Sequence, residues 1–470
     1  MTESSFKIAL LIPDGVALRN FVLGKFLHEL PDNTLVDLYH NMPQATAELY
    51  AANTPEHVTW QPMLEFSQSR TVSTLQTCLA YAHMYWANTH SMRRAASRPV
   101  RAGLKTQLRV QSCRLVGRMN ADPKRIELMD ALHLALVKRH HEVAAYKQLF
   151  EKTKPSIVFS GCQRPSNVLP AIIAAKELGI PTVTFIVSWD NLSSKGRIVA
   201  PYDHFLVWSE NMRHELLTYF PHVKNENIHV VGTPQFDPYG DPAMRWDRKD
   251  FFSRIGGDPE RPLICFSGGD VGTCPEDHEH VRILMQNIRS GAIRHNPQVL
   301  VRPSPVDDGK RYDSVRRDYP ELIFAQPRWT HSQPGDWSRV TPSAEDIQFL
   351  ANLAHYADMN INLGSTMTLD FGLHDKPVVN VAFDIADPPL FGMPVYDYYY
   401  KYEHFLPVVE FGASKIARSA DQFPGFVNAY LDNPALDREG RRKLVDLHVD
   451  VEPGKSCKAT VAALKRIARN

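Results

Sequence analysis

The chain has 470 residues, more than one hydrophobic core normally serves, so we expect two domains. Its formal net charge is +1, with 43% hydrophobic and 22% charged residues, which is typical of a globular protein and gives no indication of nucleic-acid binding. The six cysteines form no CxxC pair, so we predict reduced thiols in a cytoplasmic protein and no zinc ribbon. No segment reaches the roughly 18 apolar residues of a membrane span.

Short β-type runs alternate with helical patterns in the first half of the chain. We expect strands at 7–13, 156–161, 182–189, 204–209 and 227–232, separated by helices that include 16–30 and 165–179. A helical insertion occupies about 64–151. Strands spaced by helices of this length predict right-handed βαβ units and a parallel sheet.

The pattern restarts after TPQFDPYGDP, a segment rich in proline at residues 233–242. Further strands are expected at 262–269, 298–305, 321–326, 359–364 and 376–384, again with helices between them. We therefore predict an α/β protein with two doubly wound, Rossmann-like domains, at 1–235 and 236–470. Ligands of such sheets bind at the carboxyl ends of the strands, here expected in a cleft between the domains.

The segment NINLGSTMTLDFGLHDKPVV, residues 360–379, carries the strongest local signal. A strand ends at Gly364, Ser365 and Thr366 open a helix, and Asp370 follows one turn later. Unpaired backbone N–H groups and the positive end of the helix dipole suit such a turn to a phosphate, and the hydroxyls add donors. The alternative is that Ser365 is only a helix N-cap.

This segment resembles the sugar-nucleotide site of GT-B glycosyltransferases, and its motifs are most similar to those of the CDP-glycerol glycerophosphotransferase family. The spacing of Ser365, Thr366 and Asp370, followed by Lys376-Pro377, matches the family's S-S-v-x-f-D-x-x-x-x-x-K-P. VLVRPSP, which contains Arg302, resembles its R-x-H-P strand end, and VSWDNLSSKG resembles its W-H-G-T-P-x-K.

Two histidines of these motifs are replaced here, by Asp190 and Ser304, so a polymerase of glycerol phosphate is not expected. The resemblance then implies a nucleotide scaffold of Arg302, the Ser365–Thr366 turn and Asp370. A carboxylate in place of a histidine suits Asp190 as the general base for a sugar hydroxyl.

The loop DNLSSKG follows an apolar run that ends in Trp189. We predict that Trp189, Asn191 and Lys195 contact an acceptor at the carboxyl edge of the first sheet. Asp-Asn and Ser-Ser are also ordinary residues of an exposed turn, and that alternative stays open.

Two other strand ends of the first domain carry polar residues. Asp14 follows the first strand, and Arg19 and Asn20, one to two turns further on, are candidates for acceptor contact. In GT-B glycosyltransferases an acid or histidine in this loop often acts as the base, so the resemblance makes Asp14 a second candidate. Its alternative role is a helix N-cap. Gln163 and Arg164 end the second of these strands and are candidates for acceptor contact, or for a simple helix-entry loop.

The first strand of the second domain ends in SGGD, residues 267–270. The glycines Gly268 and Gly269 would let the backbone approach a diphosphate, with Ser267 as a further donor. A pair of glycines alone is a weak signal.

The helical insertion is strongly basic. No acidic residue occurs from Ser67 to Ala121, whereas arginines and one lysine accumulate there: Arg93, Arg94, Arg98, Arg101, Lys105, Arg109, Arg114 and Arg118. Such a surface attracts an anionic membrane or a lipid-diphosphate acceptor. The alternative is a solvated helical face balanced by acids elsewhere in the fold.

The sequence therefore predicts a GT-B glycosyltransferase that moves a sugar from a nucleotide-sugar donor to a glycan or lipid-linked acceptor in surface polysaccharide biosynthesis. We expect inversion with Asp14 or Asp190 as base, no metal and no cofactor, and a location in the cytoplasm or peripheral to the inner face of the membrane. The alternatives are a sugar-nucleotide 2-epimerase, a glycerophosphate-type transferase, and a protein that binds nucleotide sugars without turnover.

Overall fold

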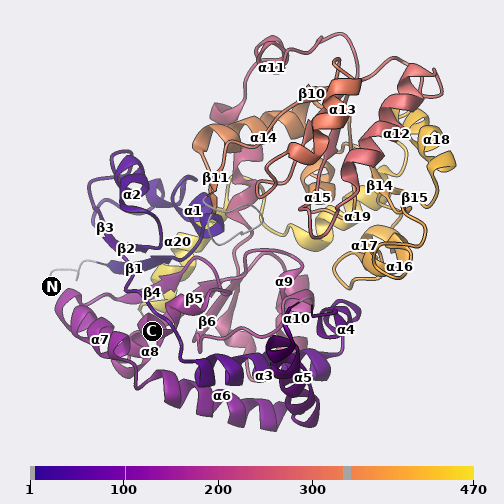
Figure 1. Ribbon diagram of the computed structural model, residues 1–470. Helices are drawn as coiled ribbons and strands as arrows, with labels where there is room; N and C mark the ends of the chain where they lie inside the picture. The colour runs from indigo at the N-terminus through magenta and orange to yellow at the C-terminus, as the bar shows by residue number, and fades with distance from the viewer. Residues whose placement is uncertain (1–5, 101, 332–339, 470) are drawn as a thin grey trace. The chain divides into compact units, whose positions relative to one another are not determined.

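The computed structural model describes residues 6–100, 102–331 and 340–469. The chain folds into two compact units, one formed by Met1–Asp237 together with Asp450–Asn470, the other by Pro238–Val449. Each unit is built around its own parallel sheet, as the alternating pattern of apolar runs and helices predicted (Figure 1).

The first unit contains a parallel sheet of seven strands among the described residues, in the order β3-β2-β1-β4-β5-β6-β7. The strands are β1 (Lys7–Ile12), β2 (Leu35–His40), β3 (Val58–Pro62), β4 (Ile157–Ser160), β5 (Thr182–Phe185), β6 (His204–Val207) and β7 (Ile228–Val230). Most of them are apolar runs buried on both faces, as a parallel sheet covered by helices requires.

The helices of this unit are α1 (Gly15–Phe21), α2 (Gln44–Ala51), α3 (Arg70–Ala87), α4 (His90–Ser97), α5 (Leu104–Met119), α6 (Pro123–Val137), α7 (His141–Thr153), α8 (Leu169–Glu177), α9 (Asn191–Ser194), α10 (Glu210–Tyr219) and α20 (Ser456–Ile467). The predicted insertion corresponds to α3 to α7, between β3 and β4. Both α5 and α6 pack against α3 (Figure 1).

Two predicted elements of the first unit differ from the structure. The strand expected at 182–189 ends at Phe185, and the loop DNLSSKG contains the short helix α9. The helix expected at 16–30 ends at Phe21, where the Phe21 ring meets Phe159 and Phe185 edge-on at 5.0 and 5.3 Å between centroids. These contacts fix α1 on the sheet.

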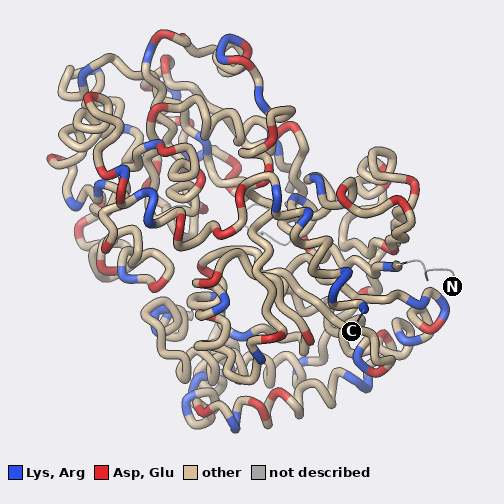
Figure 2. Tube along the Cα trace, turned by 180° about the vertical axis from the view of Figure 1, so that it is seen from behind, with Lys and Arg blue, Asp and Glu red and all other residues tan. Residues whose placement is uncertain are grey.

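The second unit has a six-stranded parallel sheet among the described residues, in the order β10-β9-β8-β13-β14-β15. Its strands are β8 (Leu263–Ser267), β9 (Gln298–Arg302), β10 (Ile323–Phe324), β13 (Met359–Asn362), β14 (Val378–Val381) and β15 (Lys415–Ala417), and a separate antiparallel pair is formed by β11 (Thr330–His331) and β12 (Val340–Thr341). Acidic and basic residues are interspersed over this unit (Figure 2).

The helices of the second unit are α11 (Arg248–Ile255), α12 (Asp277–Arg289), α13 (Asp313–Asp318), α14 (Ala344–Tyr356), α15 (Met367–Gly372), α16 (Val395–Tyr399), α17 (Leu406–Glu410), α18 (Phe423–Asp432) and α19 (Arg438–His448). Apolar residues of α12, α18 and the central strands form one buried core.

The final segment of the sequence, 450–470, packs in the first unit, although the sequence pattern placed it in the second domain. Its helix α20 packs against the turn Phe26–His28. The carboxylate of Asp237 accepts hydrogen bonds from the backbone N–H groups of Gly454, Ser456 and Cys457 at 2.9, 3.0 and 2.9 Å. A buried carboxylate thus satisfies the N–H groups at the start of α20, which have no partner within the helix.

We predict that Asp237→Ala lowers the free energy of unfolding by about 3 kcal/mol or more, because each buried N–H left unpaired costs roughly 1–3 kcal/mol. Thermal unfolding measures the loss. Asp450→Ala is the control, since Asp450 is exposed and accepts one N–H, from Glu210. Equal melting temperatures for the two variants would contradict the role of Asp237.

Candidate active site

The turn after β13 is held by a buried network of side-chain amides. Asn360, Asn362 and Asn380 lie on β13 and β14 and are fully buried. Asn362 Nδ2 donates to Asn360 Oδ1 at 2.7 Å, and Asn380 Nδ2 donates to Asn362 Oδ1 at 2.9 Å. Asn360 Nδ2 donates in turn to Ser267 Oγ at 2.7 Å, which links the ends of β13 and β8.

Asn362 also fixes the backbone of the predicted phosphate turn. Its Oδ1 accepts the N–H of Ser365 at 2.9 Å, and its Nδ2 donates to Thr368 Oγ1 at 3.2 Å. All four hydrogen-bonding positions of this amide are therefore used. The preceding Gly364 has φ of +58°, a conformation that favours glycine.

The two hydroxyl residues of the turn are half-buried and lie at the carboxyl edge of the sheet. Ser365 Oγ accepts the N–H of Met367 at 3.3 Å, but the N-cap residue of α15 is Thr366, so the alternative role of Ser365 as N-cap does not hold. This bond does not exclude a ligand, because a hydroxyl can accept one hydrogen bond and donate another. Ser365 and Thr366 therefore stay candidates for a nucleotide diphosphate.

Two tyrosines also form hydrogen bonds at the carboxyl edge of the second sheet, although the sequence analysis did not assign them to the site. The hydroxyl of Tyr400 donates to the carbonyl of Val381 at 2.6 Å, and burial raises its pKa well above the ordinary value. The hydroxyl of Tyr399 donates to the carbonyl of Thr273 at 2.9 Å, in the loop after β8. Both tyrosines thus tie neighbouring loops to the strand ends.

The structure gives Arg302 a different partner from the predicted diphosphate. Its terminal nitrogens contact the two carboxylate oxygens of Asp346 at 3.2 and 2.7 Å, and both side chains are buried. The indole of Trp329 donates to the same carboxylate at 2.7 Å. The nitrogens that could bind a diphosphate bidentately are thus engaged in a buried ion pair with Asp346.

The SGG segment after β8 owes its glycines to packing. A Cβ on Gly268 would lie 2.3 Å from the hydroxyl of Tyr312, and one on Gly269 would lie 2.4 Å from Cys274 Sγ. Ser267 is buried and bonded to Asn360. Close packing therefore accounts for the two glycines, and the hydrogen bond to Asn360 accounts for Ser267. Contact with a diphosphate, as predicted, is not required to explain them.

Asp370, predicted in the donor site, is buried to 1% exposure. It accepts a hydrogen bond from the hydroxyl of Tyr239, on the segment that opens the second unit. The motif acid therefore anchors α15 to Tyr239, a structural role that the sequence resemblance did not specify.

In the first unit, Asp14 lies at the carboxyl end of β1 and caps α1, with Oδ1 accepting the N–H of Ala17 at 2.9 Å. Burial of this carboxyl raises its pKa above the ordinary 3.8, against the lowering effects of hydrogen bonds from Ala17 and Cys162 and of the charge of Arg164. A carboxyl with a raised pKa at a strand end is a candidate for proton transfer. The carboxylate is also hydrogen-bonded by Cys162 and by the backbone of Val16, so capping is its observed role and proton transfer stays a hypothesis.

Asp190, the other candidate base, has both carboxylate oxygens engaged. Oδ1 accepts the amide of Asn191 at 2.9 Å, and Oδ2 lies 3.1 Å from both Lys195 Nζ and Ser194 Oγ. Gln163 Nε2 donates to Asn191 Oδ1 at 2.7 Å, which extends the chain of polar contacts from β5 to β4. The structure thus brings together four of the predicted residues, as a network that orders the DNLSSKG segment.

The remaining predicted residues of the first unit differ in exposure. Trp189 is 2% exposed, so its ring is a core residue and not a platform for an acceptor. Asn20 is buried and accepts from Arg19 Nε at 3.0 Å, while another nitrogen of Arg19 donates to Gln235 Oε1 at 2.8 Å. Among the predicted acceptor contacts, Arg164 and Lys195 are exposed.

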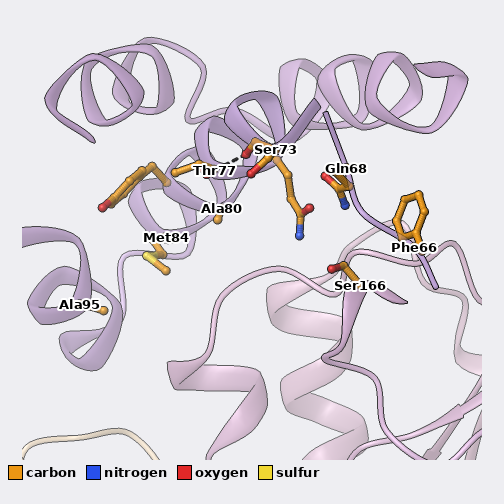
Figure 3. Close-up of a pocket in the computed structure, with 10 residues that line it drawn as sticks. Phe66, Gln68, Ser73, Thr77, Ala80, Met84, Ala95 and Ser166 are labelled. Atoms are coloured by element: carbon orange, nitrogen blue, oxygen red, sulfur yellow. Dashed lines mark hydrogen bonds between the residues drawn. The ribbon is translucent and has the colours of Figure 1, made fainter. Parts of the chain in front are cut away.

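A cavity of about 580 Å³ lies beside this edge, between α3 and the segment that follows β4 (Figure 3). Its wall is uncharged and mixes apolar with polar side chains, among them Phe66, Gln68, Ser73, Thr77, Met84 and Ser166. Both polar atoms of the Gln68 amide are buried and have no partner among the described residues. Sequence reasoning missed this cavity, because its residues come from an insertion without a motif.

No protein-family model and no curated protein matches the chain. Solved structures do share its fold. UDP-GlcNAc 2-epimerase from Neisseria meningitidis, bound to UDP-GlcNAc, aligns with a TM-score of 0.54 at 9% identity, over 99% of this chain and 100% of its own. MnaA of S. aureus, in a structure with UDP, gives 0.52 at 11% identity, over 99% and 97%.

A glycosyltransferase from Rickettsia africae also aligns, with a TM-score of 0.50 at 10% identity, over 99% of this chain and 100% of its own. At such identities the likeness establishes the fold alone. The chain has the GT-B fold of two Rossmann-like domains, as predicted. This fold is shared with enzymes that process sugar nucleotides. The narrower resemblance to CDP-glycerol transferases stays a prediction.

We predict that Asn362→Leu, which is similar in size, destabilises the second unit by several kcal/mol, because Ser365 N–H and two asparagine amides lose buried partners. Thermal unfolding and the binding of UDP, measured by calorimetry, are the readouts. The matched variant Ser365→Ala with Thr366→Ala should keep the wild-type melting temperature and lose UDP affinity. Unchanged affinity in that folded variant would remove the nucleotide from this turn.

Proposed function

We propose that the protein is a nucleotide-sugar-dependent glycosyltransferase, with the nucleotide bound at the β13–α15 turn of the second unit and the acceptor in the first unit. The observation that carries this proposal is the uncharged cavity of about 580 Å³ beside the carboxyl edge of the first sheet. One segment contributes Gln163 and Arg164 to that edge and Ser166 to the cavity wall.

The chemistry of the wall supports a neutral glycan as acceptor. Hydroxyl and amide groups from Ser73, Thr77 and Gln68 can donate to and accept from sugar hydroxyls, and Phe66 offers an apolar surface. The unpartnered amide of Gln68 favours a ligand with both donors and acceptors. A sugar-nucleotide 2-epimerase, by contrast, has no second substrate to fill such a cavity.

Asp14 is the better-supported base. Displacement at an anomeric carbon requires removal of a proton from the acceptor hydroxyl, and a carboxylate with a raised pKa accepts a proton more readily. Asp190 is paired with Lys195, so it is better suited to ordering the loop that contacts the acceptor. Inversion through a single displacement is consistent with one base.

A second function, sugar-nucleotide 2-epimerisation, is favoured by one observation: one of the solved structures with this fold is a UDP-GlcNAc 2-epimerase with bound UDP-GlcNAc. The two reactions differ in their need for an acceptor. We expect UDP-GlcNAc, or another sugar nucleotide from a panel of UDP-, GDP-, CDP- and dTDP-sugars, to raise the melting temperature. At a ligand concentration of 100 times Kd, binding should raise the free energy of unfolding by about 2.7 kcal/mol.

Product analysis with the stabilising donor then decides between the reactions. A transferase releases nucleoside diphosphate only when an oligosaccharide acceptor is present. Formation of a C2 epimer without acceptor would replace the proposal by the epimerase, and release of CMP would indicate a glycerophosphate-type transferase. Binding with no product from any acceptor tried would favour the non-catalytic alternative.

We predict that Asp14→Asn lowers kcat by 10²- to 10⁴-fold while the donor Kd stays nearly constant, which rapid-quench kinetics and calorimetry measure. In the wild type, activity should fall on acidification through a pKa above 3.8, because the base must be deprotonated. Asp190→Asn is the matched variant and should mainly raise the acceptor KM. The reverse pattern would assign the base to Asp190.

Asp14→Asn, although it should lower kcat, is not expected to lower the stability of the fold. Since the folded-state pKa of Asp14 is raised, its stabilising contribution is complete below the unfolded-state pKa and is lost as the pH rises through the folded-state pKa. At pH 7 the Asn variant should therefore be at least as stable as the wild type. A strongly destabilised variant would make the activity loss uninformative about a base.

A further inference from the structure

Helix α5 exposes a stripe of large apolar side chains. Leu104, Leu108, Leu115 and Met119 are 71%, 60%, 62% and 64% exposed. At about 100° per residue these four positions fall within an arc of roughly 60°. The opposite side of the helix is the packed one, because Cys113 and Gly117 are buried and Gly117 lies close to Tyr81 of α3.

Basic residues flank this stripe. On the same helical projection Lys105 and Arg109 lie on one side and Arg118 on the other, and all three are exposed. None has a carboxylate partner within the described part of the chain, and no acidic residue occurs anywhere from Ser67 to Ala121. Arg101, which belongs to the same basic segment, lies outside the described residues.

We propose that the α5 stripe, defined as Leu104, Leu108, Leu115 and Met119 with the flanking Lys105, Arg109 and Arg118, docks on an anionic lipid bilayer. The helix would lie in the plane of the interface, with the apolar side chains among the acyl chains and the cations at the lipid phosphates. The described helices include none with the length and apolar composition that a membrane span requires.

Charge favours a bilayer over a second copy of the chain. In a two-fold pairing of α5 with itself, both flanks of the apolar seam would carry only cations, with no acidic residue on the helix to pair with them. An anionic surface instead complements every one of these charges. The proposal does not depend on the glycosyltransferase chemistry.

Sedimentation with vesicles tests the stripe. The wild type should bind vesicles of phosphatidylcholine and phosphatidylglycerol and bind pure phosphatidylcholine much more weakly. Replacing Lys105, Arg109 and Arg118 by Gln should weaken binding about 100-fold, since each cation near an anionic surface contributes roughly five-fold. Replacing the four apolar residues of the stripe by Ser should abolish binding at high salt. Leu49→Ser with Leu390→Ser, two exposed leucines elsewhere, should have no effect.

Depth of insertion gives an independent readout. All six cysteines are buried, so a single introduced cysteine can be labelled selectively with an environment-sensitive dye on the folded protein. Dye at Leu108→Cys should shift to the blue on anionic vesicles, whereas dye at Thr106→Cys, exposed on the other side of α5, should not. No vesicle binding by the wild type, an equal blue shift at both positions, or a dimer that the Ser variant dissociates would overturn the proposal.

Discussion

A buried polar group that lacks a hydrogen-bond partner costs free energy, and several buried polar groups in this protein are paired with loops at the strand ends. Asn362 is the clearest case, because its single amide joins two strands, the N–H of Ser365 and the hydroxyl of Thr368. Asp237 does the same for the start of α20. The loops at the strand ends are therefore fixed by hydrogen bonds to residues of the sheet. The side of each loop that faces away from the sheet is then available to a ligand.

This arrangement separates two kinds of residue that look alike in a motif. Arg302 and Asp370 are buried and bonded to Asp346 and Tyr239, so they support the edge of the sheet from inside. Ser365 is half-buried at that edge. Residues that were predicted together for one site can thus differ in role, because two of them support the edge of the sheet from inside and Ser365 lies nearer the surface.

Much of the fold could be predicted from sequence, because parallel strands covered on both faces are short apolar runs between helices. β2 was not predicted, since LVDLYH interrupts its apolar residues with Asp37, which Lys7 pairs at 2.9 Å. The site was less predictable. Sequence spacing placed Asp14 and Asp190 at strand ends, yet only tertiary contacts show that Asp190 is paired with Lys195 and that Trp189 is in the core.

The return of residues 450–470 to the first unit has a consequence for synthesis. A ribosome makes Met1–Asp237 first, but the helix that Asp237 anchors emerges only after Pro238–Val449 is complete. The second unit is contiguous in sequence and can close as soon as it emerges, whereas the first must wait with the surface for α20 uncovered. The first unit can therefore complete its packing against α20 only after the second unit has been synthesised.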